Sequence, residues 1–235
     1  MPNSLRSFRK YEEDMSDSMR TVILGGSTGI GKAIASALSH RGGDVFSLGR
    51  SNGIDVASAA SIEGWFLANG EVDHVIFTAG SQAPAGMVTG LDIDAAKAAF
   101  DVKFWGAVRV AQTAAKYIRS GGTLTLTSGF LARKTVPGTF VKTTMNAALE
   151  AGVKILAREL APVRVNIVSP GLTDTEAYSG MAASDREQMF ASAAKSLPVG
   201  RVASPNDVAK GYLFVIDCDS VTGAVIDIDG GALVS

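Results

Sequence analysis

Short apolar runs alternate along the chain with segments whose apolar residues recur at intervals of three and four. Strands that are buried on both faces read as continuous apolar runs, so each run predicts a β-strand. Segments such as residues 30–38 and 95–118 predict amphipathic helices packed against a sheet. Seven strands are expected, at residues 22–24, 45–48, 54–56, 75–78, 124–127, 163–168 and 225–228.

This alternation predicts an α/β fold with a doubly wound, parallel, seven-stranded sheet and helices on both faces. Right-handed crossovers bring the carboxyl ends of the strands to one edge, where a ligand binds at the topological switch point. Functional residues are therefore expected after strands. The length fits one domain over residues 20–235, and the polar residues 1–19, with nothing to pack, are expected to form a frayed or disordered leader.

A strand, a glycine-rich turn and an alanine-rich helix follow one another without a gap over residues 21–35. A pyrophosphate that approaches the backbone at the positive end of a helix leaves no room for Cβ atoms in the turn. Glycine-rich turns also precede helices that bind nothing, which is the alternative reading. The segment predicts a dinucleotide-binding turn of a Rossmann fold, with cofactor contacts from Gly25, Ser27, Thr28, Gly29, Ile30 and Gly31.

The residues after the second expected strand indicate which nucleotide is bound. Dinucleotide folds place an acidic side chain here for a free ribose 2′-hydroxyl, and a cation for a 2′-phosphate. Shortly after this strand the sequence has Arg50 and Ser51 and no acidic residue. A guanidinium can bind a phosphate through two N–H groups, so we expect NADP(H) in preference to NAD(H). The alternative is that Arg50 is a solvated loop residue.

Charge and composition exclude several other classes of protein. The 22 Lys and Arg residues nearly balance the 23 Asp and Glu residues, and no basic stripe is present, so a nucleic-acid partner is not expected. The single cysteine rules out an internal disulfide framework, and neither histidine has neighbouring ligands at metal-binding spacing. No apolar run is long enough to cross a bilayer. We expect a metal-free protein of the reducing cytoplasm.

The glycine spacing resembles the T-G-x-x-x-G-x-G turn of the short-chain dehydrogenase/reductase family, although Leu24 replaces the usual threonine. Residues 55–56 resemble the Asp and aliphatic residue that the family places at the edge of the adenine, and residues 79–80 resemble its turn after the fourth strand. Residues 165–175 resemble the segment that binds the carboxamide of the nicotinamide. Residues 221–223 and 229–231 resemble its carboxyl-terminal signature, so that the likeness spans residues 20–232. It implies further cofactor contacts from Asp55, Val56, Ala79, Gly80, Pro170, Gly171, Leu172, Thr173 and Thr175.

Members of this family reduce carbonyls or oxidise alcohols with a Ser, a Tyr and a Lys, helped by an Asn. Ser128 matches the serine, whereas Lys142 stands at the tyrosine position and Asn146 at the lysine position. Lys103 stands where the family has the asparagine, so a Lys and an Asn have exchanged places. We expect Ser128, Lys103, Lys142 and Asn146 to form the catalytic set, with the cation relocated and not lost. The alternative is a site that has drifted and no longer does chemistry.

The sequence leaves three alternatives for the proton donor: Lys142, Tyr178, or no group of the protein. Residues 173–195, which include Tyr178, form either a lid over the ligand or an ordinary surface helix pair. Arg133 and Lys134 either select an anionic substrate or form an exposed loop pair.

Taken with the resemblance, these residues predict an NADP(H)-dependent oxidoreductase acting on a small carbonyl or alcohol. Two alternatives remain: an NADP(H)-binding sensor or structural protein without turnover, and an enzyme that uses the nucleotide only to shape a pocket for a non-redox step. The resemblance also implies a homo-oligomer, a dimer or tetramer, built from helices at residues 95–118 and 138–158.

Overall fold

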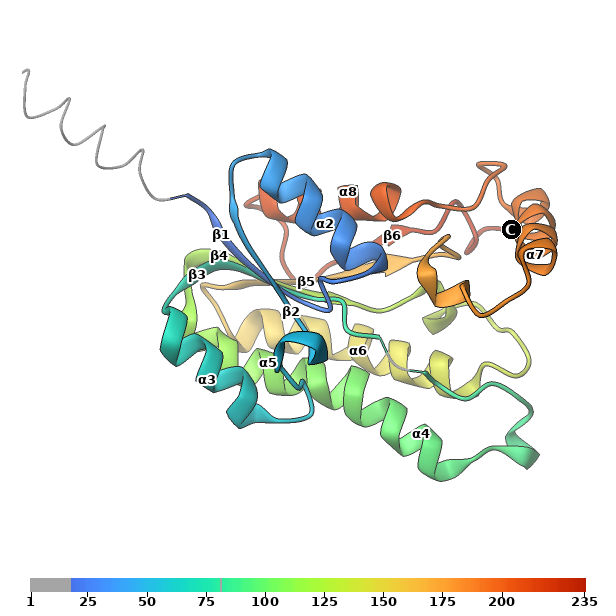
Figure 1. The fold of residues 1–235 in the computed structure, drawn as a ribbon, viewed down its shortest axis with the longest axis horizontal. Coiled ribbons are helices and arrows are strands. Elements are labelled where there is room, and N and C mark those ends of the chain that lie inside the picture. Colours follow the sequence, from blue (N-terminus) through green and yellow to red (C-terminus); the bar gives the residue numbers. More distant parts are fainter. Residues whose placement is uncertain (1–17, 81) are drawn as a thin grey trace, which may run out of the picture.

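The computed structural model describes residues 18–80 and 82–235, so the leader expected at residues 1–19 lies almost wholly outside the described residues. The described chain forms one parallel sheet in the order β2-β1-β3-β4-β5-β6 (Figure 1). The order reverses between β1 and β3, which creates the expected switch point. The strands are β1 (Arg20–Leu24), β2 (Asp44–Leu48), β3 (Val72–Phe77), β4 (Ile118–Thr127), β5 (Arg164–Pro170) and β6 (Val225–Ile228).

The doubly wound α/β fold is therefore confirmed, but the expectation of seven strands is wrong, because residues 54–56 form a turn. The Asp55 carboxylate accepts a hydrogen bond from the Ala57 amide at 2.9 Å, and the Asp55 carbonyl accepts one from the Ser58 amide at 3.0 Å. Local bonds of this kind compete with strand pairing. The Ser58 side chain then caps the next helix.

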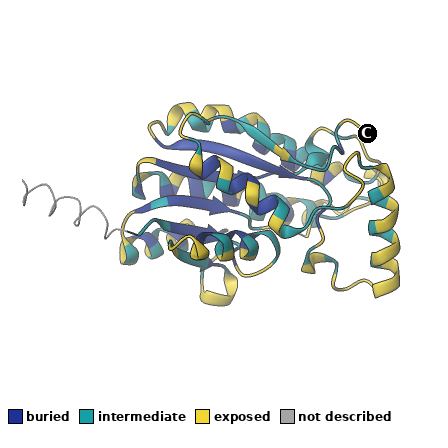
Figure 2. Ribbon diagram, turned by 90° about the horizontal axis from the view of Figure 1, so that it is seen from above, coloured by how far each residue is buried: buried dark blue, intermediate teal, exposed yellow. Residues whose placement is uncertain are grey.

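Helices cover both faces of the sheet, as Figure 1 shows. On one face lie α2 (Gly29–His40) and α8 (Pro205–Asp217), and on the other lie α3 (Ala59–Asn69), α4 (Ile93–Phe100), α5 (Gly106–Ala114) and α6 (Phe140–Glu159). A seventh helix, α7 (Ala183–Ser196), stands at the end of the molecule and buries none of its residues (Figure 2). The chain also forms short helical turns, η1 (Arg50–Asn52), η2 (Val88–Gly90), η3 (Asp101–Trp105), η4 (Ala115–Tyr117), η5 (Phe130–Ala132) and η6 (Glu176–Tyr178).

Alternate residues of each strand enter two different apolar cores. In β1, Val22 and Leu24 pack into the core beneath α3, α5 and α6, whereas Ile23 packs with Ile76 into the core beneath α2 and α8. Side chains of successive strand residues point to opposite faces, which explains this division and the continuous apolar runs in the sequence. Figure 2 shows that the strands are mostly buried and that the helices carry the exposed residues. Among the described helices, none is both long and apolar enough to span a membrane.

Candidate active site

The glycine turn packs tightly against the end of β3. Gly25 has a φ of +97°, and a Cβ atom there would lie 2.7 Å from the Ala79 nitrogen. A Cβ atom at Gly31 would lie 2.2 Å from the carbonyl oxygen of Gly25. The Thr78 amide donates to the Leu24 carbonyl at 2.8 Å and continues the pairing of β1 with β3 into the turn. The expected cofactor residues Gly25, Gly31 and Ala79 are thus neighbours at the switch point.

The amino terminus of α2 suits an anion. The helix begins at Gly29, its first turn has no acidic residue, and the side chain of the N-cap residue Thr28 does not cap it. The partial positive charge and the N–H groups of such a helix end attract phosphate. A Cβ atom placed on Gly29 would lie 3.5 Å from Thr175, so the expected carboxamide-binding segment reaches the glycine turn. The residues present therefore fit a dinucleotide with its diphosphate at this helix end.

Arg50 and Ser51 lie beside the turn, at the end of β2. The Gly25 amide donates to the Leu48 carbonyl at 2.8 Å, which holds the glycine turn against that strand end. Both Arg50 and Ser51 are exposed, and within the described residues no carboxylate pairs with the Arg50 guanidinium. Of the neighbouring pair expected at the adenine edge, Asp55 is exposed and Val56 is buried in the core.

The segment after β5 is fixed against the end of β6. The Gly171 amide donates to the Ile228 carbonyl at 3.0 Å, and a Cβ atom at Gly171 would lie 2.7 Å from the Cα of Asp229. The buried Thr173 donates its hydroxyl to the Gly171 carbonyl at 3.0 Å. Residues 170–173 therefore have a rigid position at the same edge as the glycine turn.

Lys103 lies in a π-helical turn, η3, inserted between α4 and α5. Its Nζ donates to the carbonyl oxygen of Ser128 at 3.0 Å and to Oδ1 of Asn146 at 2.7 Å. The Arg109 guanidinium donates to the Asp101 carbonyl at 3.1 Å, which stabilises the widened turn. Single π-turns inside α-helices occur frequently at functional sites. Nothing in the helical periodicity of the sequence signalled this turn.

The two candidate lysines have different environments. Burial, together with the charge of Lys142, lowers the pKa of Lys103 to about 8. Lys142 is exposed on α6. Lys103 can therefore release a proton nearer to neutral pH than a fully hydrated lysine can.

The Ser128 hydroxyl points into an internal network of charged groups. It donates to Oε1 of Glu150 at 2.7 Å, and the residue is only 4% exposed. Arg133 binds the other Glu150 oxygen at 2.9 Å and Asp227 at 2.9 Å, which raises the pKa of its guanidinium. The Asn146 side chain instead lies against Gly129, the residue after Ser128, because a Cβ atom built on Gly129 would lie 3.0 Å from Nδ2 of Asn146. The site thus gathers Lys103 and Asn146 around the backbone of Ser128 and not around its hydroxyl.

This network also includes the two cations of the loop after Ser128, Arg133 and Lys134. Arg133 is held by two carboxylates, and Lys134 donates to the carbonyls of Ala232 and Ser235 at 2.7 Å each. These contacts tie the loop to the carboxyl-terminal segment. They do not favour either cation as a receptor for an anionic substrate.

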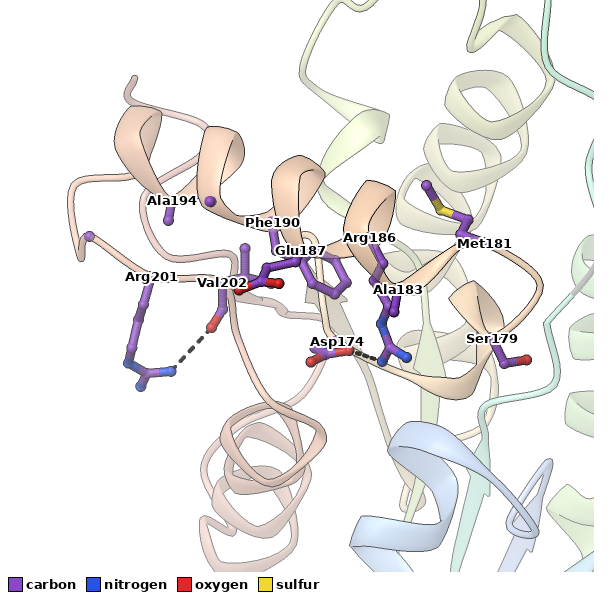
Figure 3. Close-up of a pocket in the computed structure, with 12 residues that line it drawn as sticks. Asp174, Ser179, Met181, Ala183, Arg186, Glu187, Phe190, Ala194, Arg201 and Val202 are labelled. Carbon is purple, nitrogen blue, oxygen red and sulfur yellow. Dashed lines mark hydrogen bonds and ion pairs between the residues drawn. The ribbon is translucent and has the colours of Figure 1, made fainter.

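A cavity of about 680 Å³ lies under α7, apart from the residues described above (Figure 3). Arg186 binds Asp174 across it, while Phe190 from α7 and Arg201 from the following loop line its wall. Tyr178 packs edge to face on Phe190 at 5.4 Å, and burial raises the pKa of its hydroxyl. A raised pKa makes Tyr178 a weaker proton donor near neutral pH. None of the expected cofactor or catalytic residues lines this cavity.

Comparisons with known proteins agree with the fold. A family model described as enoyl-(acyl carrier protein) reductase matches residues 25–232. A short-chain dehydrogenase/reductase of Gibberella fujikuroi is 26% identical over 98% of this chain and all of that protein. Carbonyl reductase family member 4 of Danio rerio is 26% identical over 91% of this chain and 98% of that protein.

Among solved structures, a small-chain dehydrogenase in complex with NADPH is 49% identical, with a TM-score of 0.90, over 93% of this chain and all of that chain. The region that the family model matches, residues 25–232, contains the glycine turn, η3 with Lys103 and α6 with Asn146. This chain belongs to the short-chain dehydrogenase/reductase family of oxidoreductases.

Proposed function

We propose that the protein is an NADP(H)-dependent oxidoreductase that interconverts a small carbonyl compound and its alcohol. The observation that carries this proposal is the buried ammonium of Lys103, held 2.7 Å from Asn146 at the edge of the sheet where the glycine turn lies. A buried charge is costly to keep, so its presence in a crevice marks a candidate functional group. The related small-chain dehydrogenase crystallised with NADPH supports the choice of cofactor.

The cofactor would be held by residues from several strand ends. The α2 amino terminus and its glycines would bind the diphosphate, and Arg50 with Ser51 would bind the 2′-phosphate. Residues 170–173 and Thr175 would hold the carboxamide. When bound in this way, NADPH supplies a hydride from its nicotinamide ring.

Reduction of a carbonyl requires a proton on the oxygen in addition to the hydride on the carbon. Lys103 Nζ has three N–H groups, two of which donate to Ser128 and Asn146. The third can donate to the substrate oxygen, and with a pKa of about 8 the ammonium can release that proton to the developing alkoxide. Solvent then reprotonates the amine. In the reverse direction the neutral amine accepts the alcohol proton as the hydride leaves the carbon.

The test compares Lys103→Met with Lys154→Met, a matched loss of one lysine from the exposed face of α6. NADPH binding is followed by fluorescence, and NADPH consumption is followed with a panel of aldehydes and ketones. Lys103→Met should lower turnover by about a hundredfold, a typical contribution of one proton-transfer group, while Lys154→Met should change it by less than about threefold. Equal turnover by Lys103→Met and the unchanged protein would remove Lys103 from the mechanism.

Arg50→Ala tests the choice of nucleotide. Loss of the guanidinium should weaken NADPH binding by about tenfold and leave NADH binding almost unchanged, because only NADPH carries the 2′-phosphate. Calorimetric titration with each nucleotide measures the difference. Equal weakening of both nucleotides would contradict a 2′-phosphate contact.

A second candidate function is NADP(H) binding without turnover. It is favoured by the engagement of the Ser128 hydroxyl with Glu150, which leaves that hydroxyl turned away from Lys103 and Asn146. The same substrate panel separates the two functions. Tight NADPH binding with no consumption across aldehydes, ketones and the corresponding alcohols would favour the second.

We also propose that the protein is a cytoplasmic homo-oligomer. Large apolar side chains are exposed on α4, η3 and α6, namely Ile93, Trp105 and Phe140, at 51% to 56% of their surface. They border a shallow cavity of about 340 Å³ between α4 and α6. A continuous apolar patch of this kind is typical of a contact between protein chains.

A further inference from the structure

The amino terminus of α2 is already in contact with an anion of the protein itself. The Gly29 amide donates a hydrogen bond to Oε2 of Glu176 at 2.9 Å. Glu176 belongs to η6 and lies 147 residues further along the chain. Its carboxylate therefore serves as a remote cap for a helix end that Thr28 leaves uncapped.

The proposed function puts the cofactor diphosphate at this same helix end. A carboxylate bound to the Gly29 amide and a diphosphate that uses the first-turn amides would be two anions in one small space. Lys32 is the cation of the first helical turn; it is exposed, and within the described residues it forms no ion pair with Glu176. The two anions therefore compete.

Glu176 is attached to the segment that covers the cavity under α7. The Ala177 amide, within η6, donates to the Thr175 hydroxyl at 3.4 Å. From α7, Arg186 binds Asp174 and donates to the Thr175 carbonyl at 3.3 Å. A shift of Glu176 away from Gly29 would thus move or loosen the contacts between η6 and α7.

We infer that Glu176 is an internal competitor of the cofactor diphosphate, which sets the affinity of the nucleotide site and couples its occupancy to the η6–α7 segment. This inference rests on the proposed function. Cofactor entry displaces the carboxylate from Gly29, and cofactor release lets it return. The contact lowers affinity for the nucleotide and in exchange speeds its release.

The test uses Glu176→Gln, which removes the charge, and Glu176→Ala, which removes the side chain beyond Cβ. The matched control is Glu187→Gln, an equal change of charge on the exposed face of α7. NADPH affinity and dissociation rate are measured by fluorescence. Hydrogen–deuterium exchange of residues 25–35 and 172–196 is measured on the protein without nucleotide.

Both Glu176 variants should bind NADPH about two- to fivefold more tightly, the range expected for one exposed charge at a helix end, and should release it more slowly. Without nucleotide, Glu176→Ala should exchange faster around Gly29 and in η6, because the bond to the Gly29 amide is lost. Glu176→Gln, whose amide oxygen can still accept that bond, should change less. Glu187→Gln should match the unchanged protein in every measurement.

NADPH binding and exchange rates in both Glu176 variants equal to those of the unchanged protein would overturn this inference and leave the proposed function standing. Weaker NADPH binding in both variants would also overturn it, since Glu176 would then support the cofactor. Absence of NADPH binding in the unchanged protein and in the variants would overturn the proposed function, and the competition with it.

Discussion

Among the described residues, burial lowers the pKa of two side chains, Lys103 and His74, and each shift leads to a measurable dependence on pH. Lys103 is half-buried at the sheet edge, where its Nζ lies among carbonyl and amide oxygens and is repelled by the nearby ammonium of Lys142. His74 is buried in β3, where its Nδ1 lies 2.9 Å from the Thr123 hydroxyl. In both, the loss of hydration disfavours the cationic form.

The Lys103 pKa of about 8 predicts opposite pH profiles for the two directions of the reaction. Carbonyl reduction needs the protonated amine, so its rate should fall as the pH rises through about 8. Alcohol oxidation needs the neutral amine, so its rate should rise over the same range. The measurement is kcat/KM against pH in each direction. Lys103→Arg, which stays charged, should lose this inflection, and an unchanged inflection in that variant would assign the titration to another group.

His74 predicts a loss of stability in mild acid. Burial, reinforced by the charge of Arg164 and opposed by Asp73, lowers its pKa from 6.5 to about 4. Between these values the unfolded chain binds a proton that the folded chain excludes, so the free energy of unfolding should fall as the pH drops from about 6.5 to 4. The full shift corresponds to about 3 kcal/mol. Urea unfolding at several pH values measures it, and His74→Gln should show a shallower fall; an equal fall would contradict this assignment.

At the scale of elements, the β1–α2 turn depends on the absence of side chains. In Gly31→Ala, the new Cβ atom would lie 2.2 Å from the Gly25 carbonyl oxygen, so the turn must open. We expect a loss of about 1–3 kcal/mol in the free energy of unfolding, together with weaker NADPH binding. Gly64→Ala is the control, because Gly64 lies inside α3 with open space around it and should gain about 0.5–1 kcal/mol. Thermal unfolding of both variants measures the difference, and equal effects would mean that the turn has room to relax.

Local patterns predicted most elements of this fold. The turn from β1 to α2 follows from consecutive residues, so its strand, glycines and helix could be read directly from the sequence. The strand expected at residues 54–56 is wrong because the Asp55 side chain accepts a hydrogen bond from the Ala57 amide, and the short run Ile-Asp-Val does not reveal this local bond. The helix expected over residues 95–118 is interrupted by η3 and ends before β4, which begins at Ile118.

The candidate site could be predicted only in part. Its residues were expected after strands, and the glycine turn, Ala79 and residues 170–173 do lie together there. The expected exchange of Lys103 and Asn146 brings these side chains into contact, although their catalytic roles stay predictions. The bond of Ser128 to Glu150 and that of Gly29 to Glu176 join distant segments, so no local spacing could indicate them.

At the scale of the whole molecule, one side of the sheet carries an apolar patch of α4, η3 and α6 side chains. Phe140→Arg and Ile93→Arg should each reduce the mass of the proposed oligomer, because a guanidinium in a buried contact loses its hydration. Leu67→Arg is the matched control, since Leu67 is 71% exposed on α3, away from this patch. Sedimentation equilibrium measures the mass. Unchanged mass in both patch variants would mean that this face is not the contact.

The contact between Lys103 and Asn146 also restricts the mutational paths open to this lineage. The atoms Nζ and Oδ1 lie 2.7 Å apart, so Asn146→Lys alone would confine two ammonium groups where one is already poorly hydrated. Lys103→Asn alone would leave the crevice without this cation. Each single change therefore gives a poorer site, so the effects of Lys103→Asn and Asn146→Lys are not expected to add in the double variant.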